Sequence, residues 1–236
     1  QVSRGNLAAA VPAYEQALEI YRSRHDPAGE GMIASALGDV YDQQGRAAEA
    51  LASYERVLEL GRGINLNQEA ESLNKLGHLH QRLGQPHKAL EYFLPALDKY
   101  GEAKNFVAQG LVLFHLGSLL DELGEPDQDE ELLLRALPLL RDPRDQARTR
   151  LALGQIAAER GDTEKASRLA QEALTASRQL EYRAGEAAAL RALGFLHLDG
   201  GDPGKGKEEL EQALRVFEQI DSLVGQAETR RGLGQA

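Results

Sequence analysis

Apolar and polar residues follow each other along this chain with the period of an α-helix. Between residues 33 and 58 apolar residues recur at i, i+3, i+4 and i+7 spacings, with one polar break around Gly45. This spacing places them on one face of a helix, whereas a strand would alternate at every second residue. The stretch therefore predicts two amphipathic helices joined by a turn. Their apolar faces are Ile33, Ala34, Leu37, Val40 and Tyr41, and then Ala47, Ala50, Leu51, Tyr54, Val57 and Leu58.

The helix pair is repeated along the sequence. The dipeptide Leu-Gly recurs in register at six places, and its glycine advances there by 39, 40, 37, 40 and 40 residues. A second glycine stands seven residues after each of the first five. Because glycine inside a helix costs about 1 kcal/mol relative to alanine, we expect the first glycine to admit a neighbouring helix closely. We expect the second to end its helix in the left-handed conformation. The Leu-Gly glycines are Gly38, Gly77, Gly117, Gly154, Gly194 and Gly234, and the turn glycines are Gly45, Gly84, Gly124, Gly161 and Gly201.

Several units share a ladder of small and large residues. The ladder is Leu37, Gly38, Tyr41, Ala50 and Tyr54 in one unit, Leu76, Gly77, His80, Ala89, Phe93 and Ala96 in the next, and Leu153, Gly154, Ala157, Ala166, Ala170 and Ala173 in the fourth. It resembles the tetratricopeptide repeat, whose pattern is L-G-x-x-Y, then A-x-x-x-F/Y, then a small residue. The resemblance implies an all-α fold, a right-handed α-solenoid of stacked helix-turn-helix repeats with about 12 helices.

Two units depart from that ladder. The third has Asp129 and Leu133, and the fifth Gly206 and Leu210, where the family has alanine and an aromatic residue. A period near 40 also exceeds the usual length of about 34 residues, which implies longer helices or loops. The connection from the third to the fourth unit is the shortest and contains two prolines, so we expect an irregularity there.

Stacked repeats form one array, so we expect a single tetratricopeptide repeat domain over residues 1–236. The first segment aligns with the second half of a unit and the last with the first half, which predicts a fragment of a longer protein. A naturally short chain with frayed ends is the alternative. The expected segments are 1–24 as the second helix of a truncated repeat, five full repeats at 31–61, 67–100, 106–141, 145–180 and 183–220, and 222–236 as the first helix of a further repeat or a cap.

The charge balance narrows the classes of partner. The chain has 27 Lys and Arg against 37 Asp and Glu, a net charge of −10. Surfaces that bind nucleic acid or anionic membranes need clustered basic residues, so we expect neither partner. No apolar run approaches the roughly 18 residues that span a bilayer. The absence of Cys excludes disulfides and thiolate metal sites. These features are typical of a cytoplasmic protein.

Three motifs resemble parts of nucleotide-binding or metal-binding sites, and none of them has the full set of residues that such a site needs. Residues 201–207 have the glycine and lysine spacing of a phosphate-binding loop, but Glu208 replaces the Ser or Thr that binds Mg²⁺. His78 and His80 point about 200° apart on a helix and cannot chelate one ion. His78 and His115 fall on adjacent first helices without a further ligand. We therefore expect no enzyme activity, no cofactor and no metal.

In stacked helix pairs the first helices line an inner, concave face. Residues that flank each Leu-Gly at helical spacing should face it, and we expect a protein or peptide partner to bind there. The sequence predicts a groove that is acidic toward the N-terminus and basic, with apolar patches, toward the C-terminus. The candidate partner-binding residues are Asp39, Asp42, Asn74, His78, Gln81, Phe114, Ser118, Asp121, Arg148, Gln155, Arg191 and Phe195.

Two aromatic residues of this set lie off the ladder. Phe114 and Phe195 are among only five Phe in the chain, and the core of a repeat does not require them. Either they are exposed anchors for a partner, or longer helices bury them against the neighbouring repeat. Arg191 lies one turn before Phe195, where it can bind a carboxylate of the partner in bidentate fashion.

Three functions remain open. The leading interpretation is a non-catalytic protein-protein interaction module. The chain is also similar to the sensor or autoinhibitory arms of bacterial signalling ATPases or caspase-like proteases, and a third reading is a structural spacer or a scaffold that self-associates through truncated ends. The carboxylate-clamp members of the family have Asn directly after Leu-Gly, so capture of a chaperone tail is disfavoured. This chain has Asp39, His78, Ser118, Gln155 and Phe195 there.

Overall fold

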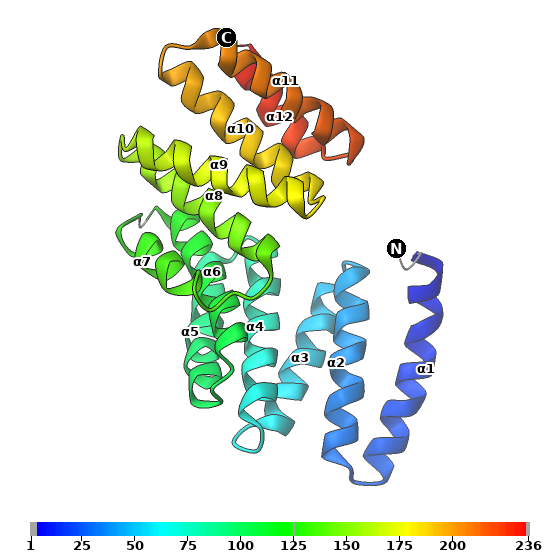
Figure 1. Ribbon diagram of the computed structural model, residues 1–236. Coiled ribbons are helices and arrows are strands. Elements are labelled where there is room, and N and C mark those ends of the chain that lie inside the picture. Colours follow the sequence, from blue (N-terminus) through cyan, green and yellow to red (C-terminus); the bar gives the residue numbers. More distant parts are fainter. Residues whose placement is uncertain (1–3, 125, 235–236) are drawn as a thin grey trace. The chain divides into compact units, whose positions relative to one another are not determined.

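The computed structural model describes residues 4–124 and 126–234, without the side chains of 4–9, 121, 126 and 127. These residues form twelve α-helices and no strand (Figure 1). The helices are α1 (Arg4–Ser23), α2 (Pro27–Gln43), α3 (Ala47–Gly61), α4 (Leu66–Arg82), α5 (Pro86–Glu102), α6 (Phe106–Leu123), α7 (Pro126–Ala136), α8 (Pro143–Glu159), α9 (Thr163–Gln179), α10 (Arg183–Asp199), α11 (Pro203–Gln219) and α12 (Leu223–Leu233).

Consecutive helices pack against each other. Helix α2 packs on α3, α4 on α5, α8 on α9 and α10 on α11, and a second helix packs on the next first helix, as α3 does on α4 and α9 on α10. This sequential packing confirms the predicted all-α fold of stacked, tetratricopeptide-like helix pairs. The contacts divide the chain into two compact units, Gln1–Val112 and Leu113–Ala236, which are described separately. The single domain expected from the sequence stays a prediction.

A glycine of the first helix meets a large side chain of the second helix in four of the five pairs. A Cβ on Gly77 would lie 2.7 Å from two ring atoms of Phe93, which is fully buried. The large side chain therefore occupies the space that a Cβ would need, and the two helices approach closely. This confirms the predicted role of the Leu-Gly glycines. The other three contacts are Tyr54 on Gly38, Leu133 on Gly117 and Leu210 on Gly194.

The fourth pair, α8 and α9, is the exception. Ala170 stands at the position of these large residues. A Cβ on Gly154 would have its nearest neighbours at 3.4 Å, the Ala166 carbonyl oxygen, and at 3.5 Å, the Leu169 Cβ. Both distances are ordinary van der Waals contacts. No large ladder residue fills the space beside Gly154.

Two kinds of turn use left-handed backbone. Within a pair, Gly45 has φ +74°, and the next residue, Arg46, donates its backbone N–H to the Tyr41 carbonyl at 2.9 Å. The other turn glycines have φ between +68° and +81°, which confirms the predicted helix caps. Between pairs, Gly63 adopts the same conformation in one turn, and non-glycine residues adopt it in four others. They are His25, Lys104, Glu181 and Asp221, with φ between +51° and +55°.

The third pair has a short second helix. Helix α7 has 11 residues and ends at Ala136, before Pro138, and α8 begins at Pro143. Asp129 is fully buried in α7 at a position where three other units have alanine and the fifth has Gly206. The expected irregularity between the third and fourth units is therefore confirmed, and the shortened helix explains the shorter period.

The N-terminal unit is held together partly by one carboxylate. Glu30 of α2 accepts hydrogen bonds from the Arg22 Nε of α1 at 3.1 Å and from the Arg56 Nε of α3 at 2.9 Å. Its side chain is 8% exposed. The hydrogen bond from Arg56, with that from Arg22, holds the pKa of Glu30 below its usual value. The carboxylate thus ties three helices together in its charged form.

Glu30→Gln should lower the free energy of unfolding by about 1 kcal/mol at neutral pH, because two charged hydrogen bonds lose their charge. A lowered carboxyl pKa gives stability that is fully present above the usual Glu pKa, about 4.3. That stability is lost as the pH falls through the folded-state pKa. Urea unfolding should therefore show a constant difference from wild type between about pH 6 and pH 8, which declines progressively as the pH falls below about 4.

The matched control for Glu30→Gln is Glu19→Gln. Glu19 pairs with the same Arg22 at 3.5 Å, but its side chain is 76% exposed. Exposed pairs contribute little, so this variant should unfold like wild type. A difference between Glu30→Gln and wild type that persists unchanged at low pH would contradict the ionic explanation.

Within the described ranges, no helix is both long and apolar enough to span a bilayer.

Candidate partner-binding site

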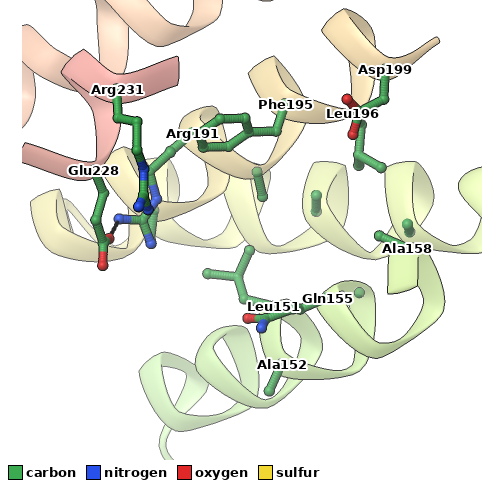
Figure 2. Close-up of a pocket in the computed structure, with 15 residues that line it drawn as sticks. Leu151, Ala152, Gln155, Ala158, Arg191, Phe195, Leu196, Asp199, Glu228 and Arg231 are labelled. Carbon is green, nitrogen blue, oxygen red and sulfur yellow. Dashed lines mark hydrogen bonds and ion pairs between the residues drawn. The ribbon is translucent and has the colours of Figure 1, made fainter. Parts of the chain in front are cut away.

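A pocket opens among the first helices of the C-terminal unit. It has a volume of about 500 Å³, which lies in the usual range for ligand pockets, about 300–1,000 Å³. Its walls come from α8, α10 and α12, and residues of α9 complete the lining (Figure 2). The lining residues are Leu151, Ala152, Gly154, Gln155, Ala158, Ala166, Ala170, Ala188, Arg191, Ala192, Phe195, Leu196, Asp199, Glu228 and Arg231.

Small side chains make room for this pocket. Six of its lining residues are alanine, and one of them, Ala170, stands where other units have Phe93 or Leu210. Gly154 beside it also lines the pocket. Ala170 thus borders the pocket with a small side chain, which is itself 2% exposed and belongs to the packed core of this unit. Most of the surface that a ligand would meet is apolar.

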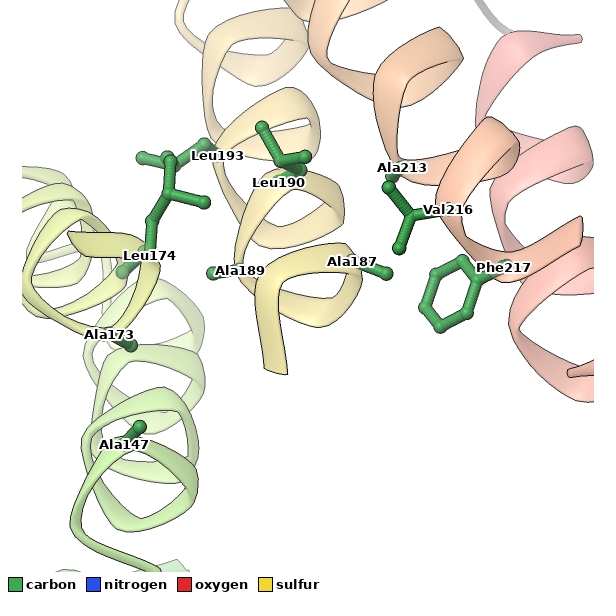
Figure 3. Packing of buried hydrophobic residues seen from close by; sticks show 11 residues of the cluster. Ala147, Ala173, Leu174, Ala187, Ala189, Leu190, Leu193, Ala213, Val216 and Phe217 are labelled. Atoms are coloured by element: carbon green, nitrogen blue, oxygen red, sulfur yellow. The ribbon is translucent and has the colours of Figure 1, made fainter. Parts of the chain in front are cut away.

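A packed core beside the pocket holds α10 in place. Leu190 and Leu193 of α10 are 3% exposed and belong to one apolar cluster with Leu174 of α9 and Val216 and Phe217 of α11. Figure 3 shows α10 between these two helices, with its side chains directed to both. The helix that presents Arg191 and Phe195 to the pocket is therefore a rigid support.

One end of the pocket carries an ion pair and an additional cation. The Arg191 guanidinium pairs with the Glu228 carboxylate of α12 and lies 5.6 Å from the centre of the Phe217 ring. Figure 2 shows Arg231 beside this pair. Arg231 is exposed and has no ion-pair partner among the residues that the structure describes. This end of the pocket keeps one positive charge for a ligand.

The other end of the pocket carries an acid. Asp199 is exposed, and no hydrogen bond or ion pair engages it within the described part of the chain. Figure 2 shows it near Leu196, with Phe195 between it and the arginines. Arg191, Phe195 and Asp199 are spaced by four residues each, so they share one face of α10. Eight residues of helix separate the two charged ends by about 12 Å.

The two candidate aromatic anchors differ in burial. Phe114 is 6% exposed, and the Arg148 guanidinium covers its ring at 4.8 Å, so the structure selects the packed alternative for Phe114. Phe195 is half-buried. Its ring rests against Gly232 of α12, where a Cβ would lie 2.6 Å away, and it lines the pocket. Phe195 is thus packed on one side and available on the other.

Residues of the N-terminal unit that were predicted to make an acidic groove are paired instead. Asp39 accepts a hydrogen bond from the Tyr54 hydroxyl at 2.8 Å and pairs with Lys75 at 2.9 Å. Burial and the hydrogen bond to Asp39 raise the pKa of Tyr54. Asp42 pairs with Arg82. The expected acidity is therefore offset by two basic residues that the sequence reasoning missed.

The other predicted residues of that unit lie on α4. The His78 ring packs edge-on against the Phe93 ring with 5.0 Å between their centres. Asn74 is half-buried, and its Oδ1 has no hydrogen-bond partner. Gln81 is half-buried as well. Nothing in these contacts gathers the three side chains into one site.

The predicted residues of the C-terminal unit divide into two groups. Gln155, Arg191 and Phe195 meet in the pocket, where the Gln155 Nε2 also donates to Glu159 at 3.1 Å. The Ser118 hydroxyl donates to the Phe114 carbonyl at 3.1 Å, away from the pocket lining. Arg148 covers Phe114, and the side chain of Asp121 lies outside the described residues.

Glu228 and Arg231 were not among the predicted residues, although the spacing rule that selected the others also applies to them. Arg191 was selected because it lies three residues before the glycine of a Leu-Gly. The same spacing applied to Gly234 selects Arg231, and the position six residues before that glycine selects Glu228. Asp199 has no such signal, because it lies at the last turn of α10.

The pocket offers apolar surface and charge, which suit it to hold a ligand. Within the part of the chain that the structure describes, no group of three or more His, Asp or Glu side chains could hold a metal ion.

Family profiles decide the identity of the repeats. A tetratricopeptide repeat profile matches residues 2–62 and 145–219, and a second tetratricopeptide repeat profile matches residues 70–103. The chain belongs to the tetratricopeptide repeat family. Tetratricopeptide repeat domains are generally protein-interaction modules and typically non-catalytic. Among curated proteins, none matches the chain significantly.

Solved tetratricopeptide-like structures agree with the fold. BtubC (BKLC) from P. vanneervenii has a TM-score of 0.77 at 20% identity, over 92% of each chain. The apo form of RapI has a TM-score of 0.78 at 16% identity, over 98% of this chain and 93% of RapI. A signal transduction ATPase with numerous domains (STAND) from Pyrococcus horikoshii, which has a tetratricopeptide repeat sensor, has a TM-score of 0.74 at 16% identity. That match covers 96% of this chain and 37% of the ATPase. At these identities the likeness concerns the fold alone.

Proposed function

We propose that this tetratricopeptide repeat chain is a non-catalytic interaction module that binds a peptide segment of a protein partner in the pocket between α8, α10 and α12. The small ladder residue Ala170 carries the proposal. The other four pairs have a large side chain at this position, whereas here an alanine lines a pocket of about 500 Å³. A segment of a partner can place an apolar side chain there.

The lining of the pocket supports a peptide as ligand. Binding pockets are mostly apolar, with a few polar groups that fix the orientation of the ligand. Here the alanines and Leu151 give the apolar surface, Phe195 gives an aromatic wall, and Gln155 gives a polar group. Aromatic residues that are partly fixed by packing are effective anchors, because they lose little conformational freedom on binding.

Ala170→Leu should weaken peptide binding without unfolding the protein, because the larger side chain takes up space at the wall of the pocket. The probe is a displayed library of 12-residue peptides selected on the wild-type protein, and the affinity of each selected peptide is then measured by fluorescence anisotropy. We expect the selected peptides to lose at least about tenfold in affinity, roughly one buried apolar side chain.

The control for that experiment is Ala48→Leu. Ala48 is exposed on α3 of the N-terminal unit, so the same substitution there should leave every affinity unchanged. Equal binding of the selected peptides by Ala170→Leu and wild type would refute the assignment of the pocket. So would a selection that yields no peptide.

A second candidate function is the sensor arm of a multidomain signalling ATPase. The similarity to the STAND ATPase favours it, because 96% of this chain aligns with only 37% of that protein, whose description names a tetratricopeptide repeat sensor. The complete reading frame tests it, since the proposal requires a nucleotide-binding domain in the same protein. A reading frame without such a domain would remove this candidate and leave the interaction module.

A further inference from the structure

We propose that the pocket selects its peptide by charge, and that the preferred segment has an acidic and a basic residue on opposite sides of an apolar residue. This inference rests on the proposed function, because it names the chemistry of the segment that the same pocket binds. It follows from the three charged groups at one end of the pocket and the single acid at the other.

The carboxylate of the segment belongs at Arg231. Arg191 is already neutralised by Glu228, whereas Arg231 is exposed and has no ion-pair partner in the described residues. A guanidinium binds a carboxylate through two parallel hydrogen bonds, which fixes the orientation of the ligand as well as adding affinity. An incoming lysine or arginine at this end would instead meet two guanidinium groups against one carboxylate.

The cation of the segment belongs at Asp199. Its carboxylate is exposed, is not engaged by any described residue, and lies at the rim where α10 ends. Asp199 is eight residues from Arg191 on the same helix face, about 12 Å along the axis. An extended peptide rises about 3.3 Å per residue, so two charged residues four positions apart span this distance.

The apolar residue lies between the two charges. Phe195 is four residues from both Arg191 and Asp199, and the small ladder residue Ala170 also lines the pocket. The middle residue of the segment would therefore contact Phe195. A leucine suits the space, because leucine fills the equivalent position in the fifth pair.

The test uses a fluorescein-labelled probe of sequence Gly-Ser-Asp-Ser-Leu-Ser-Lys-Ser-Gly. Three comparison peptides replace Asp and Lys by Asn and Gln, by two aspartates, or by two lysines. The direction of the peptide chain in the pocket is open, so the reversed sequence is not a control. Wild type should bind the Asp-Leu-Lys probe at least about tenfold more tightly than each comparison peptide, a factor typical of charge pairs and like-charge clashes at a rim.

Charge-reversal variants then exchange the preference. Arg231→Glu should prefer the peptide with two lysines, and Asp199→Lys the peptide with two aspartates. The double variant Arg231→Glu, Asp199→Lys should recover the Asp-Leu-Lys probe, bound in the opposite direction. Arg215→Glu is the matched control, because Arg215 is exposed on α11 and does not line the pocket, and it should keep the wild-type ranking.

The outcomes separate this inference from the proposed function. If Arg231→Glu and Asp199→Lys keep the wild-type ranking of peptide affinities while Ala170→Leu loses affinity, selection by charge is refuted. The assignment of the pocket as the binding site is then still supported. Selected library peptides that bind in the pocket without flanking charges would have the same meaning. If Ala170→Leu binds every peptide like wild type, the pocket itself is overturned, and the inference with it.

Discussion

Leu210→Ala should lower the free energy of unfolding by about 3 kcal/mol, the usual cost of truncating a buried leucine. Leu210 of α11 is fully buried and fills the space beside Gly194, where a Cβ would lie 2.7 Å from its Cγ. Its removal leaves a cavity between α10 and α11 that the rigid helix pair cannot close. Urea unfolding followed by circular dichroism measures the loss.

Ala170→Leu is the reverse substitution, from a small to a large residue, at the equivalent position of the fourth pair. The new side chain enters an existing pocket, so we expect the free energy of unfolding to stay the same or to rise by up to about 1 kcal/mol. A loss of about 1–3 kcal/mol, typical of an overpacked core, would show that the pocket cannot accept a ladder residue. The two variants together test whether the pocket is an unfilled ladder position.

Gly77→Ala should lower the free energy of unfolding by about 2 kcal/mol, although alanine is the better helix former. The added Cβ would lie 2.7 Å from two atoms of the Phe93 ring, and Phe93 is fully buried and cannot move aside. Thermal and urea unfolding should both show the loss, because α4 and α5 are forced apart.

Gly154→Ala is the same substitution at a glycine that no large side chain of the second helix contacts. Its Cβ would meet nothing closer than 3.4 Å, so the gain in helix propensity, up to about 1 kcal/mol, should appear as added stability. If both glycine variants lose stability equally, close approach of the second helix is not the reason for these glycines. If Gly77→Ala is as stable as wild type, the contact with Phe93 is softer than its burial indicates.

The helix pairs and the roles of their glycines were predictable because both follow from local rules that the sequence repeats. The spacing of apolar residues fixes which face of each helix is buried. A glycine at the end of a helix marks its own turn, as Gly45 does. The turns between pairs were predictable as breaks between helices, but the left-handed conformation of His25 and Lys104 was not, because neither is the residue type that usually signals it.

The charges of the candidate site were harder to predict, because each is decided by a residue about one period away. Lys75 reaches Ser35, 40 positions earlier, and Arg191 reaches Glu228, 37 positions later. Residues one period apart lie on neighbouring first helices, so a comparison of adjacent units would have found these pairs. The net charge of each helix, considered by itself, could not have revealed these pairs.

Burial of the two aromatic candidates depended on their neighbours rather than on their own positions. Phe114 is covered by Arg148 from the next first helix, whereas Phe195 is half-buried and shares its pocket with six alanines. Helical periodicity places a residue on a face of its helix. It does not report the size of the side chains opposite.

The alanine at position 170 also bears on how such proteins diverge. In an array each repeat depends mainly on its immediate neighbours, so truncating one side chain in a duplicated unit weakens that unit while the adjacent ones keep the chain folded. A single codon change at this position can therefore create a recess in one repeat or erase it in another. Gain and loss of partners could proceed by such point changes, with no rearrangement of the backbone.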